Sequence, residues 1–377
     1  MTTPAALARP DVDRDLAHDH RGSPIPNGAM IRTRIMELRR RRGLMWALVI
    51  VFMGLPTIFL TVRLIMHAVN PKVYSPAGGY QIFNNLVTAV LFILGFIVAA
   101  TLGSFAGSVD LTEGVFRHLV VTGRSRLALY FARIPAGLAI LVPVVAAGFT
   151  IVCLVCCFAA PPKTNYDGLI VPSGLTRTEF VQYAGNHSAE VVCSLPARNL
   201  QINVPCGPNG IVTNPKRLPP NFKMPSHASI VKVAREMAQQ NYRAYTEVFR
   251  VPPTSLMIKT GLWVELEAII GFIVGLGLSS LMGQRTVPVV ILMVFTLLFT
   301  PLLIHNVLKH FINVQRLIVG AAMARIEPRQ LSPVYGSNGP FQHTTIPMSV
   351  TVAVLVIVGW LVVWTALGAW RMATRDV

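Results

Sequence analysis

The chain has 377 residues, of which 13% are charged and 53% hydrophobic, and its formal net charge is +17. Soluble domains carry roughly 25% charged residues, so this composition excludes an ordinary soluble protein. The positive charge would suit a nucleic-acid partner, but the arginines lie beside apolar runs, without a zinc-finger or helix-turn-helix pattern. We therefore expect membrane lipids, and no nucleic acid, to face the basic surface.

The first 43 residues are predicted to lie in the cytoplasm. Residues 1–28 are polar, lack the apolar core of a signal peptide, and are predicted to form a disordered tail. Residues 29–43 predict an amphipathic interface helix, because Ile31, Ile35 and Leu38 share one face. Its candidate contact residues are Glu37, Arg39, Arg40, Arg41 and Arg42.

Six apolar runs are long enough to cross the ~30 Å hydrocarbon core of a bilayer. They predict an all-α polytopic membrane protein, with three spans in residues 44–160 and three in residues 256–377. Arginines gather in alternate connections, which predicts both termini in the cytoplasm and a multi-pass protein of the plasma (inner) membrane. The predicted spans are 44–62, 82–109, 127–160, 257–282, 287–305 and 346–370.

Between the second and third spans, residues 110–123 predict a cytoplasmic helix of about three turns. Asp110 is expected to cap this helix, with Glu113 at its third position, and Gly123 to end it. Apolar residues recur at helical spacing, so the helix rests on lipid headgroups, packs on a neighbouring loop, or docks into a groove of a cytoplasmic partner. The docking residues would be Asp110, Glu113, Gly114, Phe116, Arg117, Leu119 and Gly123.

Two further segments are predicted to lie outside the cell. Residues 161–255 are rich in proline and predict a small extracellular insertion with one helix over about 226–249. Cys193 and Cys206 would be oxidised there, so we expect them to form a disulfide. Residues 306–345 contain an apolar face too short to span a bilayer, which predicts a re-entrant or interfacial helix.

Glu265 and Glu267 lie within the fourth predicted span. Intramembrane acids are costly and often functional, so these residues are candidates for a substrate path or a proton role. The alternative is that they are exposed to water or structurally paired, and residues two apart point to different sides of a helix. No metal site is expected, because the cysteines of the third span have no histidine or acidic partner beside them.

The stretch around the predicted cytoplasmic helix resembles the permease subunits of ABC exporters of the type-2 superfamily. The resemblance lies in Asp-x-x-x-Gly at 110–114 and Thr-Gly-Arg-Ser-Arg at 122–126. Leu-Met-Gly-Gln-Arg-Thr at 281–286, followed by an apolar span that ends in Phe-Thr-Pro-Leu at 299–302, is similar too.

The resemblance covers about residues 29–160 and 256–377, whereas the 161–255 insertion is longer than the corresponding loop of compact members. It implies six spans per subunit and a coupling helix between the second and third spans. It also implies a second permease subunit and a separate nucleotide-binding ATPase.

The chain has no Walker A pattern and no Gly-Lys dipeptide, so no P-loop is expected here. ATP and Mg²⁺ are expected on the partner ATPase, and no catalytic residue or cofactor is expected on this chain. The leading hypothesis is the permease of an exporter for an amphiphilic, drug-like or lipid-like substrate. The alternatives are a membrane sensor or scaffold with an extracellular ligand-binding domain, and a membrane-embedded lipid-modifying enzyme. Substrate, transport direction and the choice between homodimer and heterodimer stay open.

Overall fold

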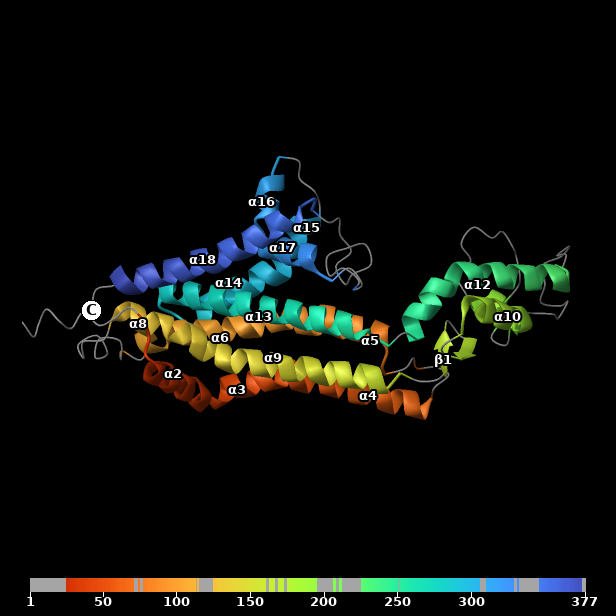
Figure 1. The fold of residues 1–377 in the computed structure, drawn as a ribbon, viewed down its shortest axis with the longest axis horizontal. Helices are drawn as coiled ribbons and strands as arrows, with labels where there is room; N and C mark the ends of the chain where they lie inside the picture. Colours follow the sequence, from red (N-terminus) through yellow and green to blue (C-terminus); the bar gives the residue numbers. More distant parts are fainter. Residues whose placement is uncertain are drawn as a thin grey trace, which may run out of the picture. The chain divides into compact units, whose positions relative to one another are not determined.

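The computed structural model describes most of the chain as helices (Figure 1). Six helical runs among the described residues are long and apolar enough to cross a membrane, which confirms a polytopic α-helical protein at this level. They are Arg42–Val69, Tyr80–Asp110, Arg126–Phe158, Thr254–Met282, Thr286–Leu303 and Val350–Thr374. The described residues are 25–70, 74, 77–112, 114, 125–160, 163–166, 169–172, 175–194, 206–207, 210–211, 225–249, 251–305, 310–328, 331 and 346–374.

The contacts divide the chain into two compact units. The first comprises residues 1–54, 87–149 and 259–377, and the second comprises residues 55–86 and 150–258. Elements of the first unit include α2 (Gly28–Arg40), α3 (Arg42–Val49), η1 (Ile50–Gly54), α6 (Ile93–Thr112), α8 (Arg126–Phe131), most of α9 (Arg133–Phe158), most of α13 (Thr254–Met282), α14 (Thr286–Val294), η4 (Phe295–Phe299), α15 (Thr300–His305), α16 (Ile312–Arg316), α17 (Val319–Ile326) and α18 (Val350–Thr374). Most of η2 (Leu86–Phe92) also belongs to it.

Helix α13 is the most enclosed span of the first unit. In its most apolar window 72% of the residues are buried, against 11% in α18, although both helices are strongly apolar. Glycines allow its backbone to touch that of α6: a Cβ at Gly271 would lie 2.6 Å from the carbonyl oxygen of Phe96, and a Cβ at Gly275 would lie still closer to the carbonyl oxygen of Ala100. On α6, Gly103 and Gly107 face α13 in the same way. The two helices therefore pack backbone against backbone.

Prolines explain two of the π-helical turns. The turn η1 lies just before Pro56, and η4 lies just before Pro301. Because proline has no N–H, the carbonyl group four residues earlier loses its helical partner and the ladder widens. In η4 the Thr300 hydroxyl donates to the carbonyl oxygen of Phe295 at 2.9 Å. The break between α8 and α9 lies before Pro135 and has the same origin.

The segment predicted as one apolar helix within 306–345 is two short helices, α16 and α17. The Leu317 carbonyl oxygen accepts a hydrogen bond from Trp360 Nε1 at 2.8 Å, and Ile318 is extended. The side-chain amide of Gln315 donates to the carbonyl oxygen of Leu303 at 2.6 Å. These tertiary bonds interrupt the helix that the apolar spacing predicted. Residues 306–309, 329–330 and 332–345 of this prediction lie outside the described part.

The second unit contains a small folded insertion between the third and fourth spans. Outside the insertion the unit contains α4 (Leu55–Val69) and α5 (Tyr80–Asn85). The insertion itself consists of the hairpin β1 (Lys163–Tyr166)–β2 (Leu169–Pro172), α10 (Arg177–Asn186), α11 (Ser188–Ser194), the hairpin β3 (Cys206–Gly207)–β4 (Gly210–Ile211) and α12 (His227–Phe249). Lys163 pairs with Pro172 and Tyr166 with Leu169. Helices α10 and α11 pack on α12 around Phe180, Ala234 and Tyr245, which are almost fully buried.

Two predictions for this insertion are confirmed. Helix α12 begins after Ser226, whose hydroxyl accepts from the backbone N–H of Ser229 at 3.3 Å. Cys193 and Cys206 form a disulfide, with 5.5 Å between their Cα atoms. The bridge ties α11 to the β3–β4 hairpin and closes a loop across a sequence separation of 13.

Candidate functional site

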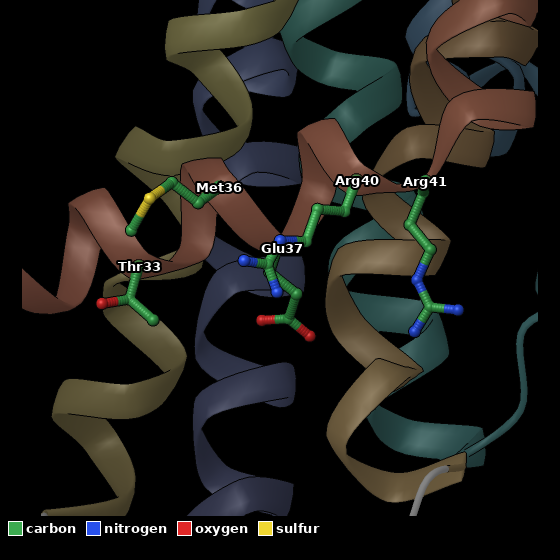
Figure 2. A pocket seen from close by; sticks show the side chains of 5 residues that line it. All are labelled: Thr33, Met36, Glu37, Arg40 and Arg41. Carbon is green, nitrogen blue, oxygen red and sulfur yellow. The ribbon is translucent and has the colours of Figure 1, made fainter.

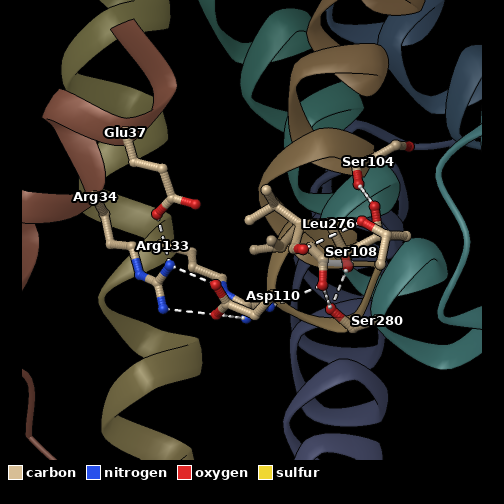
Figure 3. Close-up of polar contacts among 11 residues, drawn as sticks. Arg34, Glu37, Ser104, Ser108, Asp110, Arg133, Leu276 and Ser280 are labelled. Carbon is tan, nitrogen blue, oxygen red and sulfur yellow. Dashed lines mark hydrogen bonds and ion pairs between the residues drawn. The ribbon is translucent and has the colours of Figure 1, made fainter. Parts of the chain in front are cut away.

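A buried ion cluster joins α2, α6 and α9 in the first unit (Figure 3). Arg34 of α2 holds the Asp110 carboxylate with both guanidinium ends, at 2.7 Å to Oδ1 and 2.6 Å to Oδ2. Arg133 of α9 donates to Oδ2 of Asp110 at 2.5 Å. Asp110 is 3% exposed and Arg133 is 1% exposed. Two arginines from different helices thus converge on one carboxylate.

Further acceptors complete the cluster. Glu37 lies one turn after Arg34 and accepts from its Nη1 at 2.6 Å. Arg133 also donates to the backbone carbonyl oxygen of Gly107 at 2.8 Å. Two acids and two bases therefore balance in formal charge. This balance matters because an isolated buried ion costs several kcal/mol.

Arg34 shows how the cluster offsets burial. Burial by itself lowers the pKa of the Arg34 guanidinium, but the charges of Asp110 and Glu37 and their hydrogen bonds outweigh that effect and hold the pKa above its usual value. Arg34 therefore stays charged, and its bidentate ion pair with Asp110 holds α2 against α6.

Hydrogen bonds from serine hydroxyl groups link α6 to α13. Ser280 donates to the Gly107 carbonyl oxygen at 3.4 Å, the same oxygen that Arg133 uses (Figure 3). Ser104 reaches the carbonyl oxygen of Gly275 at 3.4 Å. Since α6 and α13 also touch at their glycines, a displacement of the end of α6 acts directly on α13.

Two more arginines brace the same end of the unit. Arg285, just before α14, donates to the Thr112 hydroxyl at 3.2 Å and lies 5.5 Å from the ring centre of Phe105. Arg126, at the start of α8, donates to the carbonyl oxygen of Ala373 in α18 at 3.2 Å. The ends of α6 and α8, which border residues 113–124, are therefore bonded to α2, α9, α13 and α18 and to Arg285 just before α14.

No family model, curated protein or solved structure matches this chain. The described residues include no group of three His, Cys, Asp or Glu side chains that could hold a metal ion. What the cluster offers chemically is a fixed set of opposite charges, which positions helices and holds no nucleophile.

The predicted capping role of Asp110 is wrong. Asp110 lies inside α6, which continues to Thr112, and so it does not precede a helix. Its carboxylate forms ion pairs with Arg34 and Arg133 and therefore cannot cap a following turn. Gly114 has φ +69°, the left-handed conformation that the sequence assigned to Gly123 as a helix end. The other predicted docking residues, Glu113, Phe116, Arg117, Leu119 and Gly123, lie outside the described part.

The predicted interface residues take two positions. Glu37 faces the ion cluster and also lines a groove of about 540 Å³, together with Thr33, Met36, Arg40 and Arg41 (Figure 2). Arg39 and Arg42 are exposed. Helix α2 buries Leu38, as its apolar pattern predicts, and keeps its basic end accessible.

The sequence analysis missed Arg133, the most buried charged side chain of the site. An arginine within a predicted span was itself a signal, since charged residues in spans face partners or water. Glu265 and Glu267 lie away from this cluster in sequence, within α13. Glu267 is 4% exposed, and neither glutamate forms an ion pair among the described residues.

Proposed function

We propose that this chain is the membrane-spanning permease subunit of an ATP-driven exporter of the ABC type-2 superfamily, working with a separate nucleotide-binding ATPase. The ATPase docks on the segment 113–124, and ATP and Mg²⁺ bind to that partner. Both termini and α2 lie in the cytoplasm, the 161–255 insertion lies outside, and the protein resides in the plasma (inner) membrane as a dimer. The cargo is an amphiphilic drug-like or lipid-like molecule.

The observation that carries this proposal is the Asp110 cluster. The segment 113–124 leaves α6 two residues after Asp110 and re-enters at α8, seven residues before Arg133. Because both arginines hold the same carboxylate, a force on this segment reaches α2, α6 and α9 together. The contact between α6 and α13 transmits this force to α13, the most enclosed span. A partner that closes and opens with ATP hydrolysis needs this kind of rigid connection.

The test uses the full-length chain purified from its native membrane in mild detergent. We expect a co-purifying chain with Walker A and B motifs that hydrolyses ATP, encoded beside this gene. Phe116→Asp and Leu119→Asp should each abolish its association and the ATP-dependent transport. Val251→Asp, an exposed apolar position in the insertion, is the matched control and should leave both unchanged. Absence of any P-loop ATPase, or full association of both variants, would overturn the proposal.

A specific observation also favours a second candidate, a membrane sensor with an extracellular ligand-binding domain. The insertion has a hydrophobic core of its own and a disulfide, which exceeds what a connecting loop needs. The identity of the cytoplasmic partner separates the two functions: a regulator without ATPase motifs would indicate the sensor.

A further inference from the structure

Glu267 is a buried acid that neither the ion cluster nor the proposed partner explains. It lies in the middle of α13, exposes 4% of its surface, and its Oε2 has no hydrogen-bond partner. Thr260, two turns earlier on the same face, is fully buried, and its hydroxyl is unpartnered as well. Two buried oxygen atoms without partners on one face of a span require an explanation.

The surroundings of Glu267 are apolar. Trp263, one turn before it, stacks on Phe92 with ring centres 4.4 Å apart and donates to the Met323 carbonyl oxygen at 3.0 Å. One turn after it, Gly271 presses against the α6 backbone at Phe96. Phe92 ends the π-helical turn η2, which has no proline to cause it, and such turns often mark functional sites.

The elements that pack on α13 bring charged side chains only near their ends. Helix α6 carries Asp110 at its last turns and α9 carries Arg133 at its start, and these two pair with each other. Helix α18 carries Arg371 in its last turn. Helix α17 carries Arg325, which donates to the Met348 carbonyl oxygen at 2.6 Å, and Glu327 follows it.

On α13 itself the other ionisable side chains are Lys259, which is exposed, and Glu265, which lies two residues from Glu267 and points to another side of the helix. Both carboxylate oxygens of Glu265 are buried and also have no hydrogen-bond partner. No described basic group therefore neutralises Glu267.

A carboxylate cannot stay ionised in such a place without a counter-charge, because an unpaired buried ion costs far more than a neutral carboxyl group. The remaining choice is the cation that neutralises it. An organic cation needs a pocket of several hundred Å³. Glu267 is instead only 4% exposed, and one turn after it Gly271 packs against the α6 backbone, so this place suits the smallest cation, a proton.

We propose that Glu267 is a proton-binding site within the membrane. Its carboxyl group carries a proton while α13 is packed as described, and it releases that proton to water, leaving a carboxylate, when this face of α13 opens. Opening is therefore favoured at higher pH, because the packed state binds one proton more than the open state. The inference goes beyond the proposed ATP-driven transport and does not depend on the partner ATPase.

Infrared spectroscopy of the full-length protein in lipid vesicles at neutral pH tests the proposal, because a protonated carboxyl group has a C=O absorption that an ionised one lacks. Because Glu265 can contribute a band of its own, we expect a component of the band that Glu267→Gln removes and Glu265→Gln leaves in place. In D₂O the band should move to lower frequency as the proton is exchanged, and faster at higher pH. Glu179→Gln is the matched control, since Glu179 is an exposed acid of the insertion.

Glu267→Asp keeps an acid at the site and provides a test if the glutamine variant does not fold. Its C=O band should shift in frequency without disappearing. Three results would overturn the proposal. One is no protonated-carboxyl band at neutral pH that depends on residue 267. Another is a band that depends on Glu265 alone. The third is a band that never shifts in D₂O, which would make Glu267 a permanently sealed structural group.

Discussion

Asp110 and Glu267 lie in two helices that touch each other, α6 and α13, and expose 3% and 4% of their surfaces. Asp110 meets two guanidinium groups, whereas Glu267 has no ion-pair partner among the described residues, and its neighbours on α13, Trp263 and Gly271, pack against an aromatic ring and the α6 backbone. Equal burial therefore leads to opposite chemistry. The paired acid is a fixed anion that holds helices together, and the unpaired one is a group that exchanges a proton.

The largest expected effect comes from removing the paired charge. Asp110→Asn leaves Arg133 buried without a counter-charge and Arg34 paired with Glu37 alone, and should lower the free energy of unfolding by about 3–5 kcal/mol. Glu267→Gln replaces one neutral group by another of similar shape and should change it by less than about 1 kcal/mol. Denaturant unfolding of both variants in mixed micelles gives the comparison. Equal losses would contradict the distinction between the two acids.

A second prediction concerns the helix contact that encloses Glu267. Gly271→Ala places a Cβ 2.6 Å from the Phe96 carbonyl oxygen and should cost about 1–3 kcal/mol, because a backbone atom cannot give way as a flexible side chain does. It should also speed the deuterium shift of the Glu267 band.

Gly359→Ala in α18 is the matched control, with no atom within 4 Å of the new Cβ. It should be neutral or stabilise by about 0.5–1 kcal/mol, because alanine suits a helix interior better than glycine. If both variants lose stability equally, the α6–α13 contact does not enclose the site.

The smallest effect is expected at an exposed acid that is paired only with its own helix end. The carboxylate of Glu179 accepts the Thr176 backbone N–H at 2.8 Å and the Thr176 hydroxyl at 2.8 Å, which lowers the pKa of Glu179. A lowered pKa stabilises α10 above the unfolded value of about 4.3, and this contribution is lost as pH falls through the folded value.

Hydrogen exchange of the first α10 amides, compared between the unmodified chain and Glu179→Gln at each pH, should show extra protection that disappears in acid. Protection that does not depend on pH would contradict the role of the charge.

The sequence predicted the spans well because their signal is local. An apolar run such as that of α13 must be helical in a bilayer, whatever it packs against. The disulfide and α12 were equally predictable from the sequence, because a disulfide in a predicted external segment and a serine helix cap each depend on few residues. The interruptions at η1 and η4 also have a local cause, the N–H that a proline lacks.

The site was less predictable because its partners are distant in sequence. Asp110 and Glu113 have the spacing of a helix cap, but Arg34 and Arg133 reach the carboxylate from 76 and 23 residues away. Tertiary contacts overrode a local pattern there, as they did at Leu317, where Trp360 interrupts the predicted helix. Arg133 carried a usable signal, because a charge inside a span needs a partner.

The most direct test of the central claim, that Asp110 joins the helices beside the segment 113–124, is a double-mutant cycle in the full-length chain. It combines Asp110→Asn with Arg133→Gln and measures the free energies of unfolding of both single variants and the double variant. We expect a coupling energy of about 2–3 kcal/mol for this pair. For Asp110 with Arg285, which contacts Thr112 and not the carboxylate, we expect a value near zero. Additive losses for Asp110 and Arg133 would show that the carboxylate does not join these helices.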